Sequence, residues 1–122
     1  MAAVEVEVEG VSKLLRMLED ASSQLVETLD GLIEQGAQLV HDTAITLVPV
    51  KTGRLKSTIR IEETGRPMER LVRAGGNMAP YAPFVEYGTY HARAQPFMRP
   101  ATEARTPEIV VLITEGMRRL FR

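Results

Sequence analysis

The sequence contains no cysteine in its 122 residues. Disulfides, thiolate zinc sites and a cysteine nucleophile are thereby excluded together. No apolar run approaches the roughly 20 residues that a membrane-spanning helix needs. The N-terminus also lacks the basic region followed by an apolar stretch that marks a secretory signal. We therefore expect a cytoplasmic protein with no membrane partner.

The motifs of common enzyme classes are lacking as well. There is no Gly-x-Ser-x-Gly, His-Glu-x-x-His or Gly-x-Gly-x-x-Gly, and Lys56-Ser57 lacks the glycines of a phosphate-binding loop. The two histidines, His41 and His91, have no second metal ligand at local spacing. Glu86 has the chemistry of a general acid, but no carboxylate partner is suggested nearby in sequence. We expect no catalytic activity, no metal and no cofactor.

The composition is that of an ordinary globular protein, with 44% apolar and 25% charged residues, and its length fits a single domain over residues 1–122. A net charge of −1 hides a division: residues 1–50 carry nine acidic against two basic side chains, and residues 51–122 carry seven against thirteen. These charges either neutralise one another within the monomer or mark two faces that attract in an assembly. A basic half that meets nucleic acid is a third reading.

Hydrophobic periodicity predicts the elements of the N-terminal half. Alternating valine and glutamate predict a strand over residues 3–9, with one apolar and one acidic face. A helical stripe then predicts a short helix near 12–20 and a long one near 23–47, with one continuous, bent helix as the alternative. Gly31 and Gly36 weaken the interior of the long helix by about 1 kcal/mol each, so we expect close packing against another element there.

Two further alternating runs, 57–63 and 69–74, predict a β-hairpin with a loop of about five residues. Its arginines, Arg60, Arg70 and Arg73, are expected to face the glutamates of the first strand. Together with the first strand the hairpin would make an antiparallel sheet. The predicted fold class is therefore α+β, with a small antiparallel sheet packed against the long helix and a C-terminal helix.

Proline and glycine punctuate the C-terminal half. Tyr81–Tyr87 is predicted to form one or two helical turns that Gly88 closes, since Pro83 suits a first turn. Residues 88–96 show neither helical nor strand periodicity and are predicted to form an irregular loop. Residues 96–101 lead into a helical turn. The sequence Thr106-Pro107-Glu108, a cap followed by proline and an acid, predicts the start of the C-terminal helix.

Five of the six aromatic residues lie between positions 81 and 97. We expect Phe84 and Phe97 to fill the core, and Tyr87, Tyr90 and His91 to make contacts with another subunit. Few apolar side chains anchor the loop, so a free monomer should hold it loosely. Its mixture of aromatic and basic residues also suits base stacking, but the pI of about 6.1 favours an oligomer contact.

Three segments resemble a known family. Residues 48–59, Val-Pro-Val-Lys-Thr-Gly-Arg-Leu-Lys-Ser-Thr-Ile, resemble the P-x-x-T-G-x-L-x-x-S-I segment of phage tail-completion proteins. Residues 81–89 followed by 96–101 resemble their Y-A-x-x-V-E-x-G-T and P-F-x-R-P-A signature. Each motif alone is weak, whereas the three in this order and spacing are specific. Over nearly its whole length the chain is similar to the neck, or head–tail joining, proteins of long-tailed phages and prophages.

The resemblance implies a structural virion protein that closes the tail tube and joins the tail to the DNA-filled head as a hexameric ring. Its implied partners are further copies of itself, the tail-tube protein and a head-side connector or stopper protein, with DNA passing through without sequence-specific contact. The implied location is the virion neck, and the host bacterial cytoplasm during assembly. The alternative is a nucleic-acid-binding protein that uses the basic half over residues 51–99.

Both lines of reasoning place the assembly surface on the turn after the long helix and on the loop region, where exposed contacts are more often functional than core-forming. The predicted interface residues are Gly53, Arg54, Glu86, Tyr87, Gly88, Thr89, Tyr90, His91, Arg93 and Arg99.

Overall fold

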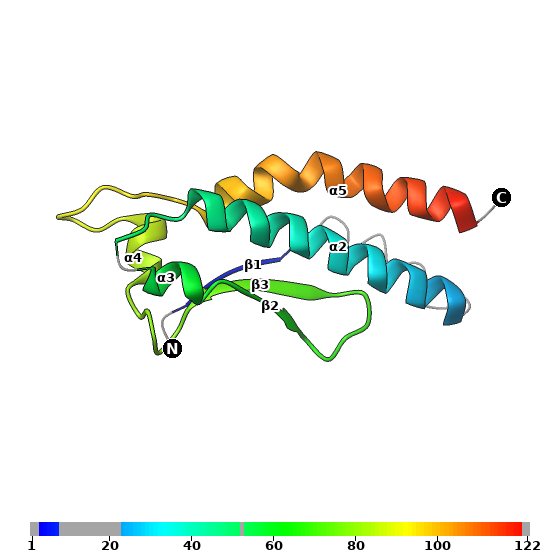
Figure 1. The fold of residues 1–122 in the computed structure, drawn as a ribbon, viewed down its shortest axis with the longest axis horizontal. Coiled ribbons are helices and arrows are strands. Elements are labelled where there is room, and N and C mark those ends of the chain that lie inside the picture. The colour runs from blue at the N-terminus through cyan, green and yellow to red at the C-terminus, as the bar shows by residue number, and fades with distance from the viewer. Residues whose placement is uncertain (1–2, 8–22, 52, 121–122) are drawn as a thin grey trace.

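The computed structural model describes residues 3–7, 23–51 and 53–120. Its sheet is antiparallel, with strands β1 (Ala3–Glu7), β2 (Arg60–Glu63) and β3 (Arg70–Gly75) in the order β1-β3-β2. The long helices α2 (Ser23–Leu47) and α5 (Met98–Leu120) lie over one face of this sheet (Figure 1). This arrangement confirms the predicted α+β fold class. The short helix predicted near 12–20 and the end of the first strand beyond Glu7 lie outside the described residues.

The buried face of the sheet follows from the period of two along β3. Val72 and Ala74 are buried under the helices, and in the register they lie opposite Ile61 of β2 and Val4 of β1 respectively. Arg73 projects from the other face. There Glu62 accepts from Arg60 at 3.0 Å and forms an ion pair with Arg73 at 3.3 Å.

The predicted strand over 57–63 is wrong at its beginning. Arg54–Ser57 forms the short helix α3, and β2 begins only at Arg60. Local hydrogen bonds stabilise the helical turn, because the hydroxyls of Ser57 and Thr58 donate to the carbonyls of Arg54 and Leu55. The Thr58 hydroxyl also accepts from the N–H of Gly75 at 2.8 Å, which ties the turn to the end of β3.

Arg70 lies on the face of β3 that α2 covers, so its partners differ from those predicted. Its guanidinium donates to Asp30 at 2.8 Å and to Glu34 at 2.7 Å, both on α2, instead of facing the glutamates of β1. The hydrogen bond from Arg70 lowers the pKa of the Asp30 carboxyl below its ordinary value, against the opposing effect of burial. Here the charges of the two halves neutralise one another within the monomer.

The C-terminal helix is longer than predicted. It begins at Met98 and continues through Pro107, whereas the sequence indicated a start at Thr106. An interior proline removes one backbone hydrogen bond and costs about 3 kcal/mol relative to alanine. Residues on both sides of it are buried, including Ala101 before and Ile109 after. Packing of both halves of α5 along α2 offsets the cost of the proline.

Candidate functional site

Residues 88–96, called the arm below, form the irregular loop that the sequence predicted. The arm links α4 (Ala82–Tyr87) to α5 and projects beyond the end of the helices (Figure 1). Residues 89–96 are all exposed, and the side chain of Tyr90 is 97% accessible. Its ring meets the ring of His91 edge-on, with the centroids 5.1 Å apart. The ring of Tyr90 is therefore almost fully open to solvent and has the ring of His91 beside it.

The two limbs of the arm are tied together at its base, which the sequence did not predict. The N–H of Gln95 donates to the carbonyl of Val85 at 2.8 Å, and the N–H of Thr89 donates to that of Ala92 at 2.9 Å. Gly88 adopts a φ of 79°, and a Cβ at this position would lie 2.8 Å from the backbone nitrogen of Ala94. Only glycine permits this close approach.

Glu86 points inward, although the sequence analysis assigned it to the assembly surface. Its side chain is 4% exposed, and its carboxylate accepts from the N–H groups of Phe97, Met98 and Arg99 at 2.8, 3.1 and 2.8 Å. These groups open α5 and have no partner within the helix. A carboxylate is favoured there because the N-terminus of a helix carries partial positive charge. Glu86 thus joins the end of α4 to the start of α5 and closes the base of the arm.

The sequence contains a signal for the capping role of Glu86. The residues before α5 are Gln95, Pro96 and Phe97, none of which is a preferred N-cap. A buried helix start without a local cap requires a distant acceptor. The carboxylate of the preceding short helix fills that need.

A groove lies between the arm, α4 and the segment that links α2 to α3. Phe84 contributes to its wall with a 59% exposed side chain, which contradicts the prediction that it fills the core, whereas Phe97 is fully buried as predicted. The reason is geometric: α4 buries Ala82 and Glu86, and Phe84 projects from the opposite side of this single-sided helix. The groove encloses about 350 Å³ and is lined by Pro49, Lys51, Gly53, Leu55, Tyr81, Phe84, Val85, Ala92, Arg93 and Gln95.

Exposed apolar side chains gather at this end of the molecule, called the arm end. The arm end is built by the described residues of 47–59 and 76–97. Seven of the nine large apolar residues that are exposed in the described part of the chain belong to these segments: Leu47, Val50, Met78, Tyr81, Phe84, Tyr87 and Tyr90. Soluble monomers rarely expose so concentrated a patch unless it binds something.

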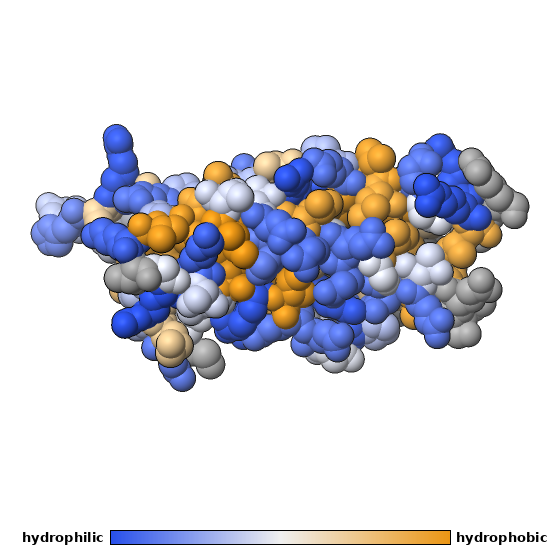
Figure 2. Space-filling view, viewed as in Figure 1, coloured by the Kyte–Doolittle hydropathy of each residue, from blue (hydrophilic) through white to orange (hydrophobic). Residues whose placement is uncertain are grey.

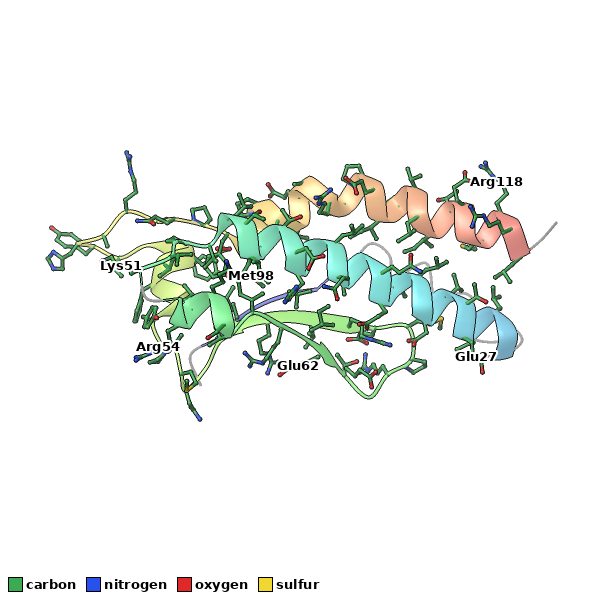
Figure 3. The ribbon with its side chains drawn as sticks, in the orientation of Figure 1. Glu27, Lys51, Arg54, Glu62, Met98 and Arg118 are labelled. Atoms are coloured by element: carbon green, nitrogen blue, oxygen red, sulfur yellow. The ribbon has the colours of Figure 1, made fainter. Side chains whose placement is uncertain are left out.

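The arm end is also basic. Lys51, Arg54, Lys56 and Arg93 are exposed there, and Figure 3 shows Lys51 and Arg54 beside α3. Within the described residues of 47–59 and 76–97 the one acid is Glu86, and it is buried. The surface therefore combines aromatic rings with cations and presents no carboxylate of its own from these segments.

The structure brings most predicted interface residues to the arm end. Gly53 has a φ of 81° and begins the turn that presents Arg54 at the start of α3. Arg99 lies in the first turn of α5, at the base of the arm, and its side chain forms an exposed ion pair with Glu103 of the same helix at 3.3 Å. The residues now found at the arm end are Gly53, Arg54, Tyr87, Gly88, Thr89, Tyr90, His91 and Arg93. Sequence reasoning missed Lys51, Lys56, Val50, Met78, Tyr81 and Phe84.

In the part of the chain that the structure describes, neither histidine belongs to a group of side chains that could bind a metal ion. His41 lies 3.2 Å from the carbonyl of Ile59 and 3.0 Å from the carboxylate of Asp42. Nowhere in residues 3–7, 23–51 and 53–120 do three His, Cys, Asp or Glu side chains gather as a metal site requires. Within the same ranges, no helix is both long and apolar enough to span a bilayer.

Comparison with known proteins finds one family. A family model described as "Bacteriophage HK97-gp10, putative tail-component" matches residues 12–88, more than half of the chain. The match ends at Gly88, where the arm begins, so it includes α2, α3, the hairpin and α4. No curated protein and no solved structure matches significantly.

Proposed function

Because the chain belongs to the HK97-gp10-like family of phage tail components, we propose that it closes the tail tube and joins the tail to the DNA-filled head. A tail component is a virion protein. The proposed role is structural and not catalytic, and the joining protein assembles in the bacterial cytoplasm before it becomes part of the neck.

The observation that carries the proposal is the apolar, basic surface of the arm end. Tyrosine, phenylalanine and arginine supply a large share of the binding energy at protein interfaces, where they pack in desolvated pockets. Seven exposed large apolar residues lie in the segments of this end, together with four exposed cations. A surface of this kind supports a role in which the protein contacts other virion proteins.

The proposed assembly is a ring of copies, hexameric as the resemblance implies, that encircles the path of the DNA. One surface of a subunit meets a different surface of its neighbour in such a ring, and the contact closes when the rotation returns to the first subunit. The tail-tube protein and a head-side connector or stopper protein are the proposed partners on the two sides of the ring.

Complementation of a phage that lacks this protein tests the proposal. Arg54→Glu reverses a charge at the arm end and should lower the titre at least about tenfold, the factor by which a loss of about 1.4 kcal/mol would weaken a binding equilibrium. Arg118→Glu makes the same change at the opposite end of the molecule (Figure 3) and should complement like the wild type. Electron microscopy should show separate heads and tails in the first case.

Two outcomes would refute the proposal. Joined, infectious particles from the phage that lacks the protein would show that joining does not need it. Full infectivity of Arg54→Glu would remove the arm end from the function. Circular dichroism of both purified variants checks that each remains folded, which is expected because both side chains are exposed.

The cluster of cations favours one second candidate, a nucleic-acid-binding protein that uses Lys51, Arg54, Lys56 and Arg93. Such binding would depend steeply on salt, because each neutralised phosphate releases counterions. A gel shift of random duplex DNA at about 150 mM salt discriminates the two functions. A clear shift that Arg54→Glu abolishes would favour DNA binding, and no shift favours assembly.

A further inference from the structure

We infer that the tip of the arm docks into a shallow hollow between α2 and α5 of a second copy of this chain. The inference rests on the proposed function, in which copies assemble, and it names the two surfaces that meet. Tyr90 is the inserted residue. The hollow receives it, and Glu108 at the wall of the hollow meets the cationic side of the arm.

The hollow is lined by one of the two exposed large apolar residues that lie outside the arm end. Of these two, Val110 and Val111, it is Val111, 61% exposed, that lines the hollow. Apolar side chains appear along the line where α5 lies over α2 (Figure 2). The hollow encloses about 430 Å³, is widely open to solvent and is lined by Leu39, Pro107, Glu108, Val111 and Leu112.

The arm and the hollow differ in shape. The arm is a protrusion (Figure 1), and its tip residue, Tyr90, is 97% exposed, with the ring of His91 beside it. The hollow is a shallow, widely open apolar surface between two helices. A tyrosine brings a large rigid ring at low entropic cost, and its hydroxyl can donate a hydrogen bond at the rim of an apolar site.

Their charges are complementary as well. The arm carries His91 and Arg93 and has no acidic residue. Among the residues that line the hollow, Glu108 provides the one charge, a carboxylate. Glu108 forms an exposed ion pair with Arg105 at 2.5 Å in the monomer. Exposed ion pairs contribute little to stability, so Glu108 can exchange or share its partner with the arm of a neighbour at little cost.

A second copy must supply the arm, because the arm of the same chain cannot reach the hollow. Val111 lies thirteen residues after Met98, the first residue of α5. At 1.5 Å per residue this places it about 20 Å along the helix. The arm extends from the same end of α5 in the opposite direction (Figure 1). Two different surfaces of one chain therefore meet, which is the heterologous contact that a ring requires.

Cross-linking tests the contact directly, because the wild-type chain has no cysteine. His91→Cys places a thiol beside Tyr90 without removing it, and Val111→Cys places one in the hollow. Mixed at equal concentration and oxidised, the two variants should give a disulfide-linked dimer. Each variant alone should give much less, and His91→Cys mixed with Glu27→Cys, on the exposed part of α2 at the other end, serves as the matched control (Figure 3).

Three results would overturn the inference. A dimer from His91→Cys alone would mean that arms pair with arms. An oligomer that forms without the mixed cross-link would place the arm elsewhere. A wild-type protein that stays monomeric at every concentration reached would exclude docking on a second copy.

The experiment uses purified protein without heads or tails, so its result is independent of joining. If the cross-link fails while complementation succeeds, the protein joins heads and tails by another contact. If the cross-link forms while a phage without the protein still joins, the subunit contact stands and the joining function fails.

Discussion

Glu86 is the residue on which the shape of the arm depends. Its carboxylate is buried, has no cation beside it in the described structure and accepts three backbone N–H groups at the start of α5. A buried charge is tolerated when hydrogen bonds satisfy it. The free N–H groups of a helix start supply both the bonds and the favourable partial charge. One side chain therefore positions the two ends of the arm relative to each other.

Glu86→Gln should destabilise the fold by about 1–3 kcal/mol, because the amide nitrogen cannot accept and would leave a buried N–H without a partner. Urea unfolding followed by circular dichroism measures the change. Glu103→Gln, an exposed position on α5, should stay within about 0.5 kcal/mol of the wild type. Equal midpoints for the two variants would contradict the capping role of Glu86.

At the scale of elements, α2 and α5 form the long contact that supports both the arm end and the hollow. Two glycines permit this approach. A Cβ at Gly36 would lie 3.2 Å from Ile109, and a Cβ at Gly116 would lie 2.2 Å from Leu32. The expectation of close packing is confirmed for Gly36, whereas Gly31 has no described atom within 4 Å of such a Cβ.

The two kinds of glycine should respond oppositely to alanine. Gly31→Ala should raise the stability by up to about 1 kcal/mol, because alanine favours a helix interior and meets open space. Gly116→Ala should lower it by about 1–3 kcal/mol, because Leu32 must leave its position between the helices. Thermal unfolding of both variants gives the comparison. A gain at Gly116 would mean that the helices do not approach as closely as described.

At the scale of the whole molecule, the acidic side chains on the one hand, and the exposed basic and apolar side chains on the other, have different roles. Part of the acidic half is neutralised within the monomer, where Arg70 binds Asp30 and Glu34. Four exposed cations and most of the exposed large apolar residues in the described part of the chain lie at the arm end. Association through this end should therefore depend more on burial of aromatic rings than on exposed ion pairs.

Tyr90→Ala should weaken self-association by about 2 kcal/mol, roughly thirtyfold, because aromatic residues at the centre of an interface dominate its energy. Arg93→Ala should cost about 0–1 kcal/mol. Sedimentation velocity at low and high salt measures both, and the salt effect should be modest.

Hydrogen exchange should show that protection of residues 88–95 rises on assembly. Equal, strong protection in monomer and oligomer, or a larger effect of Arg93→Ala, would place the interface elsewhere.

The sequence by itself determined the elements whose pattern is long and local. The helix over 23–47 was predicted with its observed bounds, because an apolar stripe that repeats over six or more helical turns fits an amphipathic helix and not a strand. The strand predicted over 69–74, the turn at Gly53 and the loop after Gly88 followed from equally local chemistry, whereas the strand predicted over 57–63 was right only from Arg60 on. The motifs at 48–59 and 81–101 were sufficient to indicate the family.

Tertiary structure alone decided what happens where short elements meet distant residues. A six-residue helix has too little pattern to reveal which side is buried, so packing turned Glu86 inward and Phe84 outward. Burial along α2 carried α5 through Pro107 against its local preference. The groove and the hollow each join residues far apart in the chain. No periodicity encodes such surfaces, because they exist only after the helices have packed.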